Sequence, residues 1–136
     1  MPVQVQLSRI IISEINDNQV IYLKEVDGVR QFHFFIGIYE ATRIDQKVRS
    51  IASPRPSPHD LIVQILDQLG ATPHDVIICD LKKGTYYAKL RLQRDGELIE
   101  IDARPSDAIA VAVTCHPPLP IFVAEDVFEA AMRDQP

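Results

Sequence analysis

The stretch TYYAKLRLQRDGELIEIDARPSDAIAVA, from Thr85 to Ala112, decides the fold of this chain. Within it, Asp95-Gly96 is typical of a two-residue β-hairpin turn. Closing the turn there places apolar residues on one face of the hairpin and opposite charges on the other, so we predict an antiparallel hairpin over 85–103. The expected pairs are Ala88 with Ala103, Lys89 with Asp102, Leu90 with Ile101, Arg91 with Glu100 and Leu92 with Ile99.

The residues that follow the hairpin predict the start of a helix. Arg104 precedes a proline and is therefore pushed toward extended geometry, whereas Pro105 suits the first helical position. Ser106 and Asp107 then fall in the first turn, where unpaired backbone N–H groups favour side-chain oxygens. The helix from Ser106 to His116 is apolar almost all round, which predicts burial against several partners. We expect a second copy of the chain to supply part of that cover, which predicts a homo-oligomer, by default a dimer.

The remaining elements are predicted from hydrophobic periodicity, turn residues and helix caps. Strands are expected over 7–13, 19–26, 76–81 and 119–123, with a hairpin turn at Asp27-Gly28 and a turn at 16–18. Helices are expected over 39–51, 57–70 and 125–132, the second with an N-cap at Ser57, a capping box with Asp60 and an apolar stripe along Leu61, Ile62, Ile65, Leu66 and Leu69. Strands joined by hairpins favour an α+β fold, a largely antiparallel or mixed sheet with a buried central helix and flanking helices.

Length and composition predict a single domain over residues 1–136, with a core over about 7–123 and a terminal helix over 125–132. The net charge of −5 argues against a protein that coats nucleic acid without specificity, but it leaves room for a local basic patch. Neither a signal peptide nor a membrane-spanning run is visible. Cys79 and Cys115 lie in apolar surroundings, so we expect free thiols and a cytoplasmic protein without membrane partners.

Several catalytic classes lack their motifs here. The sequence contains no G-x-S-x-G elbow, no Walker loop, no G-x-G-x-x-G and no H-E-x-x-H. What remains is a set of acidic and histidine side chains near the ends of predicted elements: Glu40, His59, Asp60, Asp102 and Asp107. Oxygen-rich groups with a nearby cation suit phosphoester chemistry assisted by Mg²⁺ or Mn²⁺. Each member also has a structural alternative, as a helix cap, a dipole partner or the cross-strand partner of Lys89.

Four ordered motifs resemble the bifunctional nuclease domain family. They are Phe35-Ile36-Gly37-Ile38-Tyr39-Glu40-Ala41, Arg55-Pro56-Ser57-Pro58-His59-Asp60-Leu61, Tyr86-Tyr87-Ala88-Lys89-Leu90 and Asp102-Ala103-Arg104-Pro105-Ser106-Asp107-Ala108-Ile109-Ala110, and the closing Pro120-Ile121-Phe122-Val123 fits as well. The resemblance covers roughly 7–123. It implies a compact α+β domain that tends to self-associate, with deoxyribonuclease and ribonuclease activity in some members.

Two functional hypotheses follow. In the first, the chain is a nuclease acting on DNA and RNA with low sequence specificity, in which Glu40, Asp102 and Asp107 bind the metal. Catalysis would use these carboxylates with His59 and Asp60, while Arg104, Ser106 and Lys89 bind the substrate. In the second, the chain is a non-catalytic regulatory domain that binds a small anion at the corner formed by Arg104 and Ser106.

Overall fold

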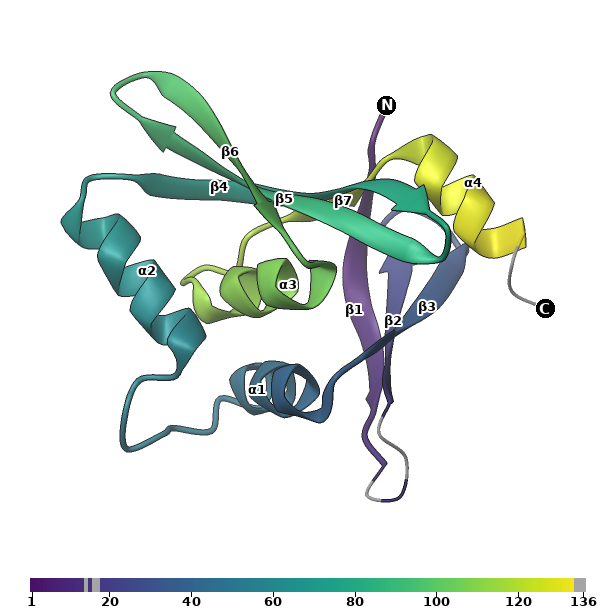
Figure 1. The fold of residues 1–136 in the computed structure, drawn as a ribbon, viewed down its shortest axis with the longest axis horizontal. Helices are drawn as coiled ribbons and strands as arrows, with labels where there is room; N and C mark the ends of the chain where they lie inside the picture. The colour runs from purple at the N-terminus through teal and green to yellow at the C-terminus, as the bar shows by residue number, and fades with distance from the viewer. Residues whose placement is uncertain (14, 16–17, 134–136) are drawn as a thin grey trace.

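The computed structural model describes residues 1–13, 15 and 18–133, in which four helices pack on one seven-stranded mixed sheet (Figure 1). The strands are β1 (Val3–Ile11), β2 (Gln19–Glu25), β3 (Gln31–Ile36), β4 (Thr72–Lys82), β5 (Thr85–Arg94), β6 (Glu97–Ala103) and β7 (Ile121–Val123). The helices are α1 (Ile38–Val48), α2 (Pro58–Gln68), α3 (Pro105–Thr114) and α4 (Glu125–Arg133). This architecture confirms the predicted α+β class.

The short strand β7 joins two hairpin units into the sheet order β3-β2-β1-β7-β4-β5-β6. It pairs antiparallel with β1 and parallel with β4, and every other neighbouring pair is antiparallel. In Figure 1 the strands β1–β3 cross the direction of β4–β6 steeply, and α1 and α3 lie in the angle between the two units. Glu40 on α1 and Arg104 at the start of α3, both predicted site residues, lie at this junction.

The hairpin register predicted over 85–103 is confirmed at every expected pair, including Lys89 opposite Asp102. The charged partners differ from the expectation. The guanidinium of Arg91 binds Asp75 on β4 through two nitrogens, with a distance of 2.7 Å from Nη2 to Oδ2. The ammonium of Lys89 lies 3.9 Å from Glu100 instead of pairing with Asp102.

Strands β2 and β3 pair with Leu23 opposite Phe32 and Ile21 opposite Phe34, the register that a turn at Asp27-Gly28 implies. Strand β1 begins four residues earlier than predicted, at Val3, because its first residues pair with β7. Strand β2 ends at Glu25, one residue before the predicted end, and β3 begins at Gln31, so the turn around Asp27-Gly28 is wider than two residues. The predicted turn at 16–18 lies largely outside the described residues.

The sequence predicts the N-terminal cap of α2 correctly but places the C-terminal end of α1 less accurately. Ser57 accepts a hydrogen bond from the backbone N–H of Asp60, and the carboxylate of Asp60 accepts one from Ser57, so the capping box is confirmed. Helix α1 ends at Val48, three residues before the predicted end, because Ser50 adopts a left-handed conformation with φ 57°. Both cysteines are free thiols, as predicted.

Helix α3 is covered by this chain alone. Its apolar residues are buried against α1, α2, β4 and β5, and Ala108, Ile109 and Ala112 are almost fully inaccessible. The prediction that a second copy supplies part of the cover of α3 is therefore wrong. No helix in the described part of the chain is both long and apolar enough to span a membrane.

The unpartnered apolar surface lies elsewhere. Of the predicted apolar stripe on α2, only Leu66 packs against the core, whereas Leu61, Ile62, Ile65 and Leu69 are exposed. Strand β6 is an edge strand, and its Leu98, Ile99 and Ile101 are exposed as well. Exposed apolar side chains concentrated on one helix are typical of an interface between proteins.

We therefore expect self-association through α2 instead of α3. The replacement Ile65→Glu should shift the particle toward monomer, because it places a charge in the buried centre of the interface. The replacement Val29→Glu, at an exposed residue on the β2–β3 turn, is the matched control and should leave the assembly unchanged. Light scattering at micromolar concentration is the measurement, and a monomeric wild-type chain would contradict the prediction.

Candidate functional site

Arg104 is the centre of a chain of polar contacts that joins three helices. It is the N-cap residue of α3, with an extended backbone (φ −68°, ψ 144°). Its Nε donates to Asp107 Oδ2 at 2.8 Å, and its Nη2 donates to Glu40 Oε1, on α1, at 3.1 Å. The hydrogen bond to Asp107 raises the pKa of Arg104 above its already high value, with Glu40 adding to the effect.

His59 extends this chain of contacts to α2. Its Nε2 lies 3.1 Å from Asp107 Oδ1, and because an ionised carboxylate only accepts, Nε2 donates the hydrogen bond. The residue is only 4% exposed, and its buried Nδ1 makes no hydrogen bond with any described residue. The predicted residues Glu40, His59, Arg104 and Asp107 are thus brought together as one connected group, which we call the Arg104 network.

Asp60 lies next to His59 in sequence but faces a different neighbour. It completes the capping box and accepts a hydrogen bond from Lys47 on α1. Burial raises the pKa of Asp60, but the bonds from Lys47 and Ser57 outweigh it, so its pKa lies below the ordinary value. These contacts give Asp60 a structural role in fixing α2 against α1, while its predicted catalytic role stays a prediction.

Asp102 and Lys89 are not part of the Arg104 network. Asp102 is exposed on β6, and within the described residues no hydrogen bond or ion pair links it to the network. The ion pair of Lys89 is with Glu100. Their assigned roles in metal and substrate binding remain predictions that no contact in this structure supports.

The arrangement does not fit a preformed metal site. Two of the three predicted ligands, Glu40 and Asp107, share Arg104 as their partner, so a guanidinium occupies the space between them. Among the described residues, no three His, Cys, Asp or Glu side chains are grouped closely enough to hold a metal ion. The predicted Mg²⁺ or Mn²⁺ remains a prediction, and no step below depends on it.

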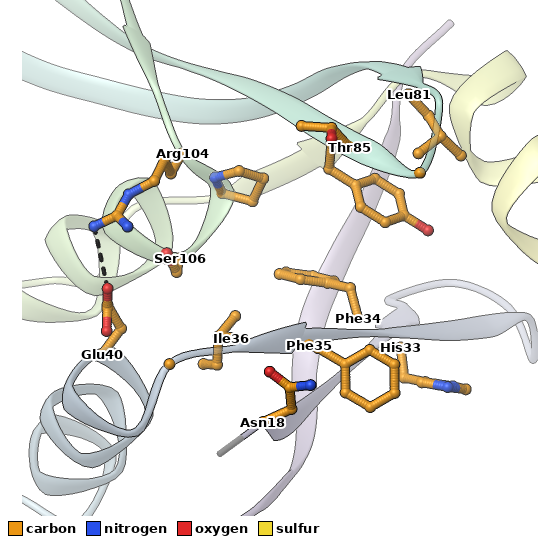
Figure 2. A pocket seen from close by; sticks show the side chains of 14 residues that line it. Asn18, His33, Phe34, Phe35, Ile36, Glu40, Leu81, Thr85, Arg104 and Ser106 are labelled. Atoms are coloured by element: carbon orange, nitrogen blue, oxygen red, sulfur yellow. Dashed lines mark hydrogen bonds and ion pairs between the residues drawn. The ribbon is translucent and has the colours of Figure 1, made fainter.

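A cavity of about 630 Å³ opens beside the Arg104 network (Figure 2). Glu40, Arg104 and Ser106 line one end of it, and His33 and Phe35 line the other. Ser106 is only 8% exposed, and no described residue forms a hydrogen bond with its hydroxyl. Glu40 is the single carboxylate among the described residues that line the cavity.

Aromatic rings in this cavity are the part of the site that sequence analysis missed. Phe34 and Tyr86 line it in ring contact, at 5.4 Å between centroids, whereas Phe35 borders it with its ring on the other side of β3 (Figure 2). Their signal was their position in the family motifs, since Phe35 opens the first motif and Tyr86 opens the third. Periodicity alone assigned them to strands and could not bring β3 and β5 together, because that contact depends on how the sheet curves.

Gly37 serves this site by its lack of a side chain. Its backbone is in an ordinary extended conformation (φ −73°), so the turn into α1 does not require glycine. A Cβ at this position would lie 2.9 Å from Glu40 Oε2. The glycine therefore leaves room for the Glu40 carboxylate beside Arg104.

Comparison with known proteins assigns the family. The model of the bifunctional nuclease domain matches residues 20–135. The chain belongs to the bifunctional nuclease domain family. An uncharacterized protein of Mycobacterium tuberculosis is 35% identical over 128 residues, which cover 94% of this chain and 75% of that protein. Bifunctional nuclease 1 of Oryza sativa is 31% identical over 112 residues, covering 65% of this chain and 34% of the rice protein. Bifunctional nuclease 1 of Arabidopsis thaliana is 31% identical over 70 residues, covering 49% of this chain and 22% of the plant protein.

The structural role of Asp60 predicts a pH-dependent loss of stability. Because the folded state lowers its pKa, the ionised carboxylate stabilises the fold above about pH 4 and loses this effect as the pH falls through the folded-state pKa. Asp60→Asn should therefore cost about 1 kcal/mol at pH 7, the typical value of a helix cap, and progressively less below pH 4. Chemical denaturation at several pH values measures this. Asp67→Asn, an exposed residue on the same helix, is the control, and an equal loss in both variants would contradict the assignment.

Proposed function

We propose that this chain is a nuclease that hydrolyses phosphodiester bonds of DNA and RNA with low sequence specificity at the cavity beside Arg104. The observation that carries the proposal is the combination found there: a cation fixed by two carboxylates, a hydroxyl at a helix N-terminus and aromatic rings around one space. A phosphate needs the first two, and a base can stack on the third. The names of the plant relatives agree with this chemistry.

Each cavity residue has a role in the proposed reaction. The hydrogen bonds of Arg104 to Asp107 and Glu40 use Nε and Nη2, which leaves Nη1 for the phosphate oxygens. The Ser106 hydroxyl and the free N–H groups of the first turn of α3 add hydrogen bonds that stabilise charge on the phosphate. Glu40, the carboxylate at the cavity wall, takes the proton from the attacking water as the new P–O bond forms. The P–O bond to the leaving oxygen breaks, and that oxygen takes its proton from solvent.

Asp107 and His59 act as positioning residues. Asp107 holds Arg104 through Nε, and buried His59 holds Asp107 in turn, so both act on the substrate through Arg104. His59 is not among the described residues that line the cavity, and it is only 4% exposed. Its predicted catalytic role is therefore replaced in our proposal by orientation of the guanidinium.

A second candidate function follows from the same contacts. Both carboxylates of the network are already occupied by Arg104, an arrangement that also suits a non-catalytic domain in which the corner of Arg104 and Ser106 binds a small anion. In that case inorganic phosphate should raise the thermal midpoint of the chain without any turnover of nucleic acid.

The nuclease proposal is tested on highly purified protein with labelled DNA and RNA. Glu40→Gln should lower turnover by about 10²-fold or more, the usual contribution of a general base, while substrate binding persists. Arg104→Lys should weaken substrate binding because an ammonium cannot bridge Asp107 and Glu40 in the same geometry. Asp60→Asn is the control that loses stability and keeps activity, as a structural role for Asp60 requires.

Full activity of Glu40→Gln would contradict the role of Glu40. Absence of cleavage by the wild-type chain, together with stabilisation by phosphate that Arg104→Lys removes, would support the anion-binding alternative over the nuclease.

A further inference from the structure

The outward face of strands β1–β3 carries a continuous row of cationic and aromatic side chains. Arg9 on β1 is the direct cross-strand neighbour of Tyr22 on β2, and Tyr22 is the neighbour of His33 on β3. Phe35 follows two residues after His33 and therefore projects from the same face. We call Arg9, Tyr22, His33 and Phe35 the aromatic row.

Contacts within the aromatic row hold its rings close to one another. The guanidinium carbon of Arg9 lies 5.8 Å from the centroid of the Tyr22 ring. The rings of Tyr22 and His33 are 5.1 Å apart, and those of His33 and Phe35 are 6.0 Å apart and nearly perpendicular. A β-bulge in β1 between Leu7 and Arg9 produces this alignment, because it moves Arg9 into the position opposite Tyr22.

The face is uncovered in the described chain. Alternate residues of β2 and β3, such as Leu23 and Phe34, are buried toward the helices, whereas residues of the other parity are half-buried or exposed. Phe35 is 62% exposed, which is unusual for a phenylalanine in a strand. A large apolar ring kept in solvent beside polar neighbours is typical of a recognition surface.

The charge of this face suits an anionic partner, although the chain as a whole is acidic. Strands β1–β3 contain a single carboxylate, Glu25, which projects from the same face as buried Leu23 and binds Arg30. The charged residues that project from the outward face are Arg9 and Lys24, and the others there are uncharged. A partner with regularly spaced negative charges and flat rings would match both features of the face.

The aromatic row also borders the proposed active site. His33 and Phe35 belong to the edge strand β3, which borders the cavity that Arg104 and Ser106 line, and their side chains lie on the other side of this strand from Phe34 (Figure 2). A strand bound to the row would therefore pass around the edge of β3 to reach the anion-binding end. We propose that the outward face of β1–β3 binds single-stranded nucleic acid, an inference that rests on the proposed nuclease function. The bases stack on Tyr22 and Phe35, and the backbone lies near Arg9 and Lys24.

Single strands, and not duplexes, fit this geometry. In a duplex the faces of the bases are stacked on each other, whereas in a single strand they are free to stack on protein rings. Every base has such a face, which also explains binding to DNA and RNA alike without reading the sequence. The proposal thus narrows the substrate of the proposed nuclease to unpaired strands.

The experiment measures binding of a fluorescent phosphorothioate dT12, which resists hydrolysis, and of a duplex of the same length and chemistry. Wild type should bind the single strand more tightly. Tyr22→Leu and Phe35→Leu should each weaken that binding at least about fivefold, whereas Tyr22→Phe and Phe35→Tyr, which keep the rings, should not. Arg9→Gln should lower the slope of log K against log salt by about 0.7, the loss of one phosphate contact in a single strand.

Leu98→Ala, an exposed apolar residue on β6, is the matched control and should bind like wild type. Phe35 is mostly exposed, so its variants should fold even if a change at half-buried Tyr22 does not. Equal binding by the leucine variants and wild type, preference for the duplex, or no binding of either probe would overturn the proposal.

Cleavage of natural oligonucleotides, measured in parallel, separates this inference from the proposed function. Ring-dependent binding without any cleavage by wild type would leave the stacking surface standing and remove the nuclease. Cleavage by the leucine variants at the wild-type rate, with unchanged affinity, would do the reverse.

Discussion

Burial of helix α3 is the constraint on which the rest of this structure depends. A helix that is apolar on nearly all sides requires neighbours on all sides, and α1, α2, β4 and β5 supply them. Ala108, Ala110 and Ala112 allow these neighbours to approach closely. Because the helix is fixed this tightly, its first turn is fixed as well, which places Ser106 inside the cavity and Arg104 at its edge.

The ion pairs of the Arg104 network contribute more to geometry than to stability. The Arg104 side chain is 69% exposed, and exposed pairs typically contribute about 0–1 kcal/mol. The network fixes the orientation of the Arg104 guanidinium. Asp107 and Glu40 hold this group from two sides, and buried His59 fixes Asp107. A planar donor group fixed in this way can meet a phosphate without first losing conformational entropy.

Sequence patterns predicted the local features of the fold well and the long-range ones only in part. The hairpin register over 85–103 followed from the alternation of apolar and charged residues, and the capping box of α2 followed from the identities of Ser57 and Asp60. The apolar stripe on α2 was identified, but its exposure was not, because periodicity marks an apolar face without saying what covers it. The start of β1 was missed since residues 3–5 pair with β7, a partner more than 110 positions away.

The candidate site was predictable to a similar degree. Glu40, His59, Arg104 and Asp107 were identified from motifs at element ends, and the structure connects them. Asp102 was grouped with them because it is close to Arg104 in sequence, but a strand and a helix leave their junction in different directions. The aromatic lining was not found, since Phe34 and Tyr86 come from β3 and β5, which are separated by four other strands in the sheet order.

The acidic charge of the chain, which at first argues against nucleic acid as a partner, loses force once charges are placed on the fold. At physiological salt, exposed charges are largely screened beyond about 8 Å, so a ligand responds to the nearby side chains more than to the total of −5. The outward face of β1–β3 carries cations without carboxylates, whereas exposed Glu97, Glu100 and Asp102 lie on β6, the opposite edge of the sheet. Segregation of this kind allows one face to attract a phosphate backbone while the rest of the surface keeps the protein soluble.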